Sequence, residues 1–256
     1  MVPFTEVVHN LELLIAGLGI GVVFGLFGAG GSAFATPVLA LVGIPGAAAI
    51  ASPLPAMLPA ALLGARRSIR AGTLDRRIAG LAVAGGVPGT IVGALASSQV
   101  SGHRLLVLSG LMLFAVGARV LMPDPVGHVA ACAARRNRNS LILAASFGVG
   151  VLTGLLANGG GFLLVPLFVV ILGLTSKEAA GTSMLAVGAL TVPTLVTHWA
   201  LGHIDWPVAL LFALGMLPGS LAGAQIGQHL SAQRARRAFG VVLVSFAAYF
   251  LTRQVL

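Results

Sequence analysis

A glycine-rich segment interrupts a long apolar run near the start of the chain, and a related segment interrupts another run 129 residues later. The first copy covers residues 25–32 (GLFGAGGS) and is followed by Pro37; the second covers residues 154–161 (GLLANGGG) and is followed by Pro166. Glycines this dense disfavour a helix interior and a strand, and they favour a sharp turn whose backbone N–H groups face a ligand. The two copies therefore predict a binding site built from the backbone.

The apolar runs around these breaks predict membrane-spanning helices. Hydrophobic residues make up 57% of the 256 residues and charged residues only 8%, whereas soluble domains carry about a quarter charged residues. In a membrane, unwound backbone is tolerated only where it is buried in protein or lines a cavity. Because a span needs about 20 residues, the second run of each half is too short to cross upright alone. The predicted fold class is an all-α, polytopic membrane protein with these hydrophobic segments, one short or re-entrant in each half: 11–27, 33–42, 47–65, 78–96 and 105–122, then 141–157, 162–172, 179–201, 208–229 and 235–252.

The sequence repeats itself over nearly its whole length. At a shift of 130 residues, Pro88-Gly89 matches Pro218-Gly219, and other short patterns match at the same shift. Such similarity indicates an internal duplication. We therefore expect a first membrane repeat over residues 1–122, a cytoplasmic linker over 123–139 and a second membrane repeat over 140–256.

Arginines crowd different loops in the two halves. Five of them lie within residues 66–77, whereas the equivalent loop at 198–205 has no Lys or Arg. Residues 234–237 carry three, whereas their counterpart at 99–104 carries one. Because Lys and Arg favour cytoplasmic loops, we expect two inverted repeats of about five segments each, with both termini outside. The formal net charge of +9 belongs to these loops, so no nucleic-acid partner is expected.

Three further patterns accompany the first glycine-rich segment: Gly181-Thr182-Ser183, residues 202–206 (GHIDW) and residues 217–224 (LPGSLAGA). Together with residues 25–32, they resemble the sulfite exporter TauE/SafE family. The resemblance covers both halves. It implies a permease of the bacterial inner membrane for small sulfur-containing anions such as sulfite, sulfoacetate and other organosulfonates. The chain departs from the family pattern at Ala51-Ser52-Pro53, where Gly-Thr-Ser is usual.

Candidate anion contacts come from the two breaks and from polar side chains near them. Helices that begin near Ser32 and Gly161 would offer free N–H groups and a partial positive charge; the alternative role of the glycines is close helix packing. Hydroxyl groups could line the anion path or bond to their own helix. His198 could relay a proton, donate to an oxyanion or serve as an interfacial polar residue. The expected anion contacts are Gly28, Gly30, Gly31, Ser32, Ser52, Asn158, Gly159, Gly160, Gly161, Thr182, Ser183 and His198.

Proline inside two of the longer runs adds a candidate for movement. Pro88 and Pro218 should kink their helices, and they would act either as gating joints or only to shape the helices. Acidic residues fall mostly at run ends or in loops, which argues against a membrane carboxylate that couples transport to protons.

The pattern of residues as a whole predicts transport. The chain has no HExxH, no paired catalytic carboxylates, no Ser-His-Asp set and no phosphate-binding loop, so we expect no enzyme, no metal and no cofactor. The expected function is a secondary transporter, an exporter, of sulfite or a small organosulfonate, with membrane lipids around it and a homo-oligomer as an open option. The alternatives are an anion-conducting channel and a non-transporting membrane scaffold.

Overall fold

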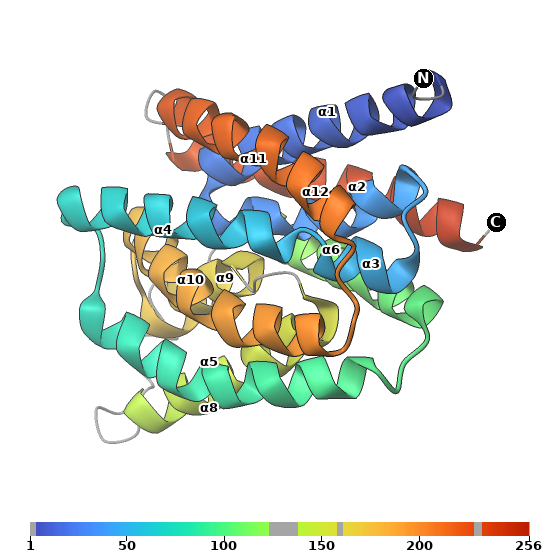
Figure 1. Cartoon of the computed structure of the whole chain (residues 1–256). Helices are drawn as coiled ribbons and strands as arrows, with labels where there is room; N and C mark the ends of the chain where they lie inside the picture. Colours follow the sequence, from blue (N-terminus) through green and yellow to red (C-terminus); the bar gives the residue numbers. More distant parts are fainter. Residues whose placement is uncertain (1–3, 123–137, 158–160, 228–231, 256) are drawn as a thin grey trace.

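The computed structural model describes residues 4–122, 138–157, 161–227 and 232–255. Every regular element in these ranges is helical (Figure 1). The first half contains α1 (Phe4–Phe27), the 3-10 helix η1 (Gly28–Phe34), α2 (Ala35–Leu41), α3 (Gly46–Ala51), α4 (Leu54–Arg70), α5 (Arg76–Ser97) and α6 (Gly102–Leu121). The second half contains α8 (Arg138–Leu156), α9 (Gly161–Leu172), α10 (Ser176–Ala200), α11 (Trp206–Gly227) and α12 (Ala232–Val255). Most of the predicted linker lies outside the described residues.

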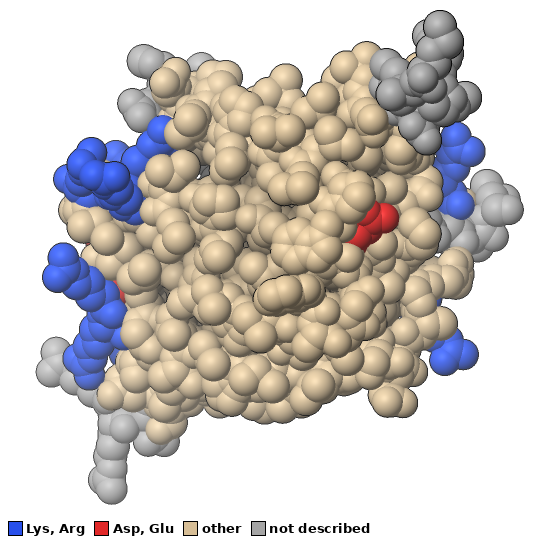
Figure 2. All heavy atoms as spheres, in the orientation of Figure 1, with Lys and Arg blue, Asp and Glu red and all other residues tan. Residues whose placement is uncertain are grey.

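Seven segments of the described chain are long and apolar enough to cross a membrane: Val8–Phe27, Gly46–Arg70, Arg76–Ser97, Gly102–Leu121, Arg138–Leu156, Lys177–Ala200 and Trp206–Gly227. Figure 2 shows Lys and Arg at two opposite edges of the molecule, with an almost uncharged band between them. The apolar stretch Gly31–Leu41 and the 12-residue helix α9 are shorter, as the sequence predicted. The predicted all-α, polytopic membrane fold is confirmed.

Glycine-lined faces hold the two closest helix pairs together. In the pair of α1 and α11, a Cβ added to Gly21 would overlap the Met216 carbonyl, and one added to Gly219 would overlap the Leu18 carbonyl. The pair of α5 and α8 repeats this arrangement, since a Cβ on Gly89 would overlap the Phe147 carbonyl. Lipid chains are as apolar as the helices, so association depends on close packing through small residues. This requirement explains much of the high glycine content.

Equivalent helices of the two halves pair with each other, α4 with α10 and α6 with α12. The start of α10 lies beside the turn that follows α4, and the start of α4 lies beside the turn that follows α10. The two helices are therefore antiparallel. Each of these turns contains a glycine in the left-handed region, Gly72 with φ of 67° and Gly202 with φ of 70°. The turns that follow α4 and α10, which match at the 130-residue shift, thus share this backbone conformation.

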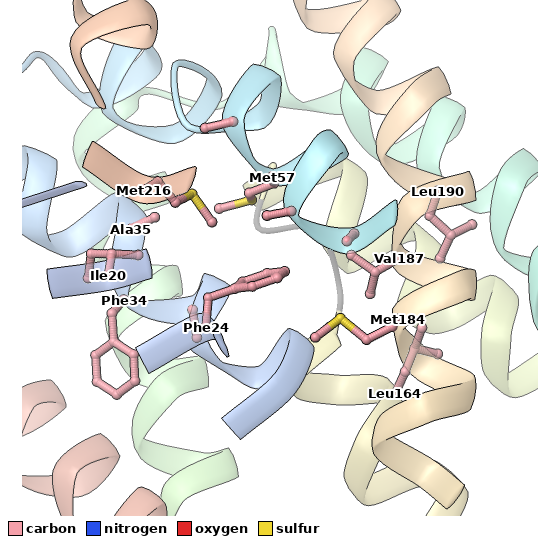
Figure 3. Close-up of a cluster of buried hydrophobic side chains, with 14 of the residues drawn as sticks. Ile20, Phe24, Phe34, Ala35, Met57, Leu164, Met184, Val187, Leu190 and Met216 are labelled. Atoms are coloured by element: carbon pink, nitrogen blue, oxygen red, sulfur yellow. The ribbon is translucent and has the colours of Figure 1, made fainter. Parts of the chain in front are cut away.

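The centre of the molecule is filled by apolar side chains from both halves (Figure 3). Phe24 of α1, Met57 of α4, Met184 of α10 and Met216 of α11 all belong to one buried cluster. Methionine is flexible and adapts to irregular spaces. This cluster gives the molecule a mainly apolar interior built from residues of both halves.

Candidate functional site

The first glycine-rich break forms a tight 3-10 turn against α1. The helical segment begins at Gly28 rather than near Ser32, and it runs directly into α2, where the Ala35 N–H donates to the Ser32 carbonyl. A Cβ on Gly31 would overlap the backbone of Phe24, so this glycine permits a close approach. Ser32 is buried. Gly28 and Gly30 lie in the same 3-10 turn.

The second break follows the end of α8. Ala157, which is buried, ends that helix in the left-handed region with φ of 48°, where a residue with a Cβ is unusual. Asn158, Gly159 and Gly160 lie outside the described residues, and α9 begins at Gly161 as predicted. The first break and the helix that follows the second break touch, because η1 packs against α9.

Two buried hydroxyl groups join the halves at opposite ends of the α4–α10 pair. Thr182 Oγ1 accepts a hydrogen bond of 3.0 Å from the Asp75 N–H, which we name the Thr182 latch. Ser52 Oγ accepts one of 3.1 Å from the Asp205 N–H, which we name the Ser52 latch. The two acceptors match at the 130-residue shift, and so do the two donors. Each hydroxyl therefore binds the other half of the molecule. The sequence indicated that such hydroxyl groups either line the anion path or bond to their own helix, and it did not predict this role.

The neighbours of these hydroxyl groups differ between the halves. Ser183 Oγ donates to the carbonyl of Ala180 in its own helix at 2.9 Å. In the first half, Pro53 occupies the equivalent position and separates α3 from α4. Proline has no N–H to continue the helical ladder, so the departure from the Gly-Thr-Ser pattern becomes a helix break.

His198 lies buried near the end of α10 and is partnered at both ring nitrogens. Its Nε2 is 2.8 Å from the Gly154 carbonyl oxygen, which belongs to the second glycine-rich segment. Its Nδ1 is 3.0 Å from Nδ1 of His203 in the following turn. A carbonyl only accepts, so Nε2 of His198 carries a hydrogen and, in the neutral ring, Nδ1 accepts from His203. Partial burial lowers the pKa of His203 from its usual 6.5.

The prolines of α5 and α11 face outward. Pro88 and Pro218 are both exposed. Two residues after each proline, a hydroxyl group bonds to its own helix: Thr90 Oγ1 donates to Val87 O and Ser220 Oγ to Leu217 O, both at 2.8 Å. The two prolines thus lie on the outer surface, and their gating role stays a prediction.

Sequence reasoning missed a polar feature on α8. Thr153 and Ser146 are buried hydroxyl residues without a hydrogen-bond partner. They share one face of α8 with the buried side chains of Ile142, Val149 and Leu156, as spacings of three and four residues require. At the 129-residue shift, the counterpart of Thr153 is Phe24, which fills the apolar centre. The presence of threonine where the first half has phenylalanine is the sequence signal that could have revealed this polar feature.

The chain matches known membrane proteins over nearly its full length. The model of the family described as "Sulfite exporter TauE/SafE" matches residues 13–250. A probable membrane transporter protein of Xylella fastidiosa is 28% identical over 95% of this chain and 97% of its own length. The probable membrane transporter protein YunE of Bacillus subtilis is 25% identical over 84% of this chain and 86% of its own length. No solved structure matches the chain significantly. The chain therefore belongs to the sulfite exporter TauE/SafE family and is a membrane transporter.

Proposed function

We propose that the protein is a secondary transporter that exports sulfite or a small organosulfonate across the bacterial inner membrane. The family description supports the substrate class. Export of an anion also agrees with a negative cell interior, which favours outward movement by about 2.3 kcal/mol per charge and 100 mV. The antiparallel pairing of α4 with α10 supports opposite orientations of the two halves in the membrane, the arrangement found in many alternating-access carriers.

The observation that carries this proposal is the unpaired, buried hydroxyl of Thr153. Buried polar groups are nearly always hydrogen-bonded, so an unpaired one calls for an explanation. Thr153 directly precedes Gly154, at the start of the second glycine-rich segment, and the carbonyl of Gly154 already binds His198. A buried hydroxyl donor at the start of this glycine-rich segment is suited to an oxyanion, because hydroxyl groups donate to negative oxygen.

The test is sulfite efflux from proteoliposomes that contain purified protein, with Thr153→Val as the variant. Valine has the shape of threonine without the hydroxyl. Removing an unpaired buried hydroxyl should leave the melting temperature unchanged or raise it, whereas removing a hydrogen bond to a charged substrate should lower transport about tenfold. Thr191→Val is the matched control, since the hydroxyl of Thr191 is buried and already donates to Val187 O at 2.7 Å.

The outcomes separate the candidate functions. Saturable efflux that falls in Thr153→Val and persists in Thr191→Val supports the proposal. Current that rises with sulfite concentration without saturation would indicate a channel. Absence of flux and of binding for sulfite and a panel of organosulfonates, in folded protein, would favour a scaffold and contradict the proposal.

A further inference from the structure

When both rings are neutral, three of the four ring nitrogens of His198 and His203 take part in hydrogen bonds. His198 donates from Nε2 to Gly154 O and accepts at Nδ1 from His203. This arrangement leaves Nε2 of His203 as a free lone pair on the ring that is nearer to solvent, since His203 is only partly buried whereas His198 is fully buried. An added proton therefore goes to Nε2 of His203, and the other nitrogens keep their roles.

Resting on the transport function proposed above, we infer that His198 and His203 form a proton-binding site that opens the Ser52 latch. The proton comes from the water on that side of the membrane and returns to it. Only one covalent bond is made, between the proton and Nε2 of His203. Proton binding by the two histidines thus controls the access of substrate at this end of the α4–α10 pair.

The turn between α10 and α11 connects the proton to the latch. His203 holds this turn to α10 through its ring and through its N–H, which donates to the His198 carbonyl at 3.0 Å. Two residues later, the Asp205 N–H makes the Ser52 latch, while the Asp205 carboxylate accepts from the Val208 N–H. A charged imidazole is disfavoured in a partly buried place. The protonated ring is stabilised by moving toward water, and this movement breaks its hydrogen bond to His198 and releases the turn that carries the latch donor.

The equivalent turn of the first half lacks this titratable pair. At the 130-residue shift, His198 and His203 correspond to Ser68 and Thr73. The Thr73 hydroxyl bonds to the Ser68 carbonyl, and the Thr73 N–H does the same at 3.1 Å. Hydroxyl groups do not titrate in the physiological range, so the Thr182 latch has no proton-dependent anchor. One latch responds to pH and its counterpart does not.

Few other charges face the pair. Of the helices that pack against α10, α4 and α5 carry their ionisable groups near the opposite end of α10, where Thr182 lies. Helix α8 carries its ionisable group at its start, which is also far from His198. These residues are Arg66, Arg67, Arg70, Arg76, Arg77 and Arg138. No ionisable residue lies on α9 or η1. Lys177 and Glu178 are in the first turn of α10, about 30 Å along the helix from His198. Ile204 of the turn packs against a buried cluster that includes residues of α6 and α12. The exposed ionisable residues of these two helices at this end are His103, Arg104 and Arg253. Asp205 is the acidic residue of the same turn, and its carboxylate accepts from the Val208 N–H.

The experiment measures cysteine labelling of purified protein without any anion, so it is independent of the substrate. Ala51→Cys serves as the reporter, because Ala51 is buried next to Ser52. The background carries Cys132→Ser, since Cys132 is the single native cysteine. Each rate is divided by that of exposed Arg70→Cys at the same pH, which cancels the titration of the thiol itself. Burial lowers the pKa of His203 below 6.5, so the relative rate should rise about fivefold as the pH falls from about 7.5 to about 5.

Substitutions then assign the response to the pair. His203→Asn places an amide nitrogen near the position of Nδ1, which still donates to His198 but does not titrate, so the reporter should become independent of pH. His103→Asn should leave the response unchanged, and a reporter at Ala179→Cys beside the Thr182 latch should show none. Ser52→Ala should label rapidly at every pH. The inference is overturned if the reporter does not respond to pH, or if His203→Asn responds as the parent does. Loss of sulfite efflux with this pH response intact would contradict the proposed function alone.

Discussion

At the scale of single residues, hydroxyl groups supply much of the buried polar chemistry of this protein. Ser52 and Thr182 join the halves, and others return to their own helices, as Thr194 does to Leu190 O at 2.8 Å. Thr153 does neither. A hydroxyl that bonds to its own helix is typical in membranes. An unpaired one is therefore the residue on which we place the anion.

Glu178 has a structural role that its sequence position did not reveal. It is exposed and forms a capping box with Thr175, whose N–H donates to Glu178 Oε2 at 3.0 Å while the Glu178 N–H donates to Thr175 Oγ1 at 3.3 Å. Glu178→Gln keeps a side chain that fits this box, so sulfite efflux and melting temperature should both stay close to those of the parent. Thr175→Ala, the control, should cost about 1 kcal/mol of stability. Abolished efflux in folded Glu178→Gln would assign proton coupling to this carboxylate.

Much of the local structure could be predicted from residue types alone. The start of α9 follows from Gly161, and the long helices follow from the pattern of apolar runs, which depends only on neighbouring residues. The start of the first short segment does not, since it lies at Gly28 rather than near Ser32. The partners of Ser52 and Thr182 could not be predicted, because they lie 153 and 107 residues away in the chain. Hydropathy does not record which helices become neighbours. The pairing of His198 with His203 was missed for a different reason, since the geometry of a turn decides it.

At the scale of helices, glycine spacing determines which pairs pack most closely. In α1, the side of Gly21 meets the Met216 carbonyl of α11, whereas a Cβ on Gly19 would meet nothing within 4 Å. The sequence showed abundant glycine, but the two kinds of position look alike in sequence. Whether a glycine packs against another helix depends on the direction that it faces in the assembled bundle.

This contrast gives a matched pair of substitutions on one helix. Gly21→Ala should destabilise the protein by about 1–3 kcal/mol, because the added methyl group overlaps backbone that cannot move aside. Gly19→Ala should be neutral or stabilising, since alanine favours helix over glycine by about 1 kcal/mol. The measurement is the melting temperature of the purified protein in one detergent. Equal melting temperatures for the two variants would contradict the glycine packing of α1 against α11.

At the scale of the whole molecule, the two halves enclose an apolar centre and hold one latch at each end of the α4–α10 pair. Met57, Met184 and Met216 come from three helices and fill the space between the ends. A carrier needs its two ends to open separately, and flexible methionine side chains are suited to a centre that must rearrange. The latches are equivalent by sequence, and only the Ser52 latch has a histidine pair beside it.

The opposite orientation of the halves can be tested at one pair of equivalent positions. Arg70 ends α4 and Ala200 ends α10; they match at the 130-residue shift, and both are exposed. The arginines around Arg70 favour the cytoplasmic side, and α10 is antiparallel to α4. In a Cys132→Ser background, a membrane-impermeant maleimide added to intact cells should therefore label Ala200→Cys and leave Arg70→Cys unlabelled. Inverted membrane vesicles should give the reverse pattern. Labelling of both cysteines from the same side would mean that α4 and α10 do not cross the membrane in opposite directions, and it would remove the two-sided role assigned to the latches.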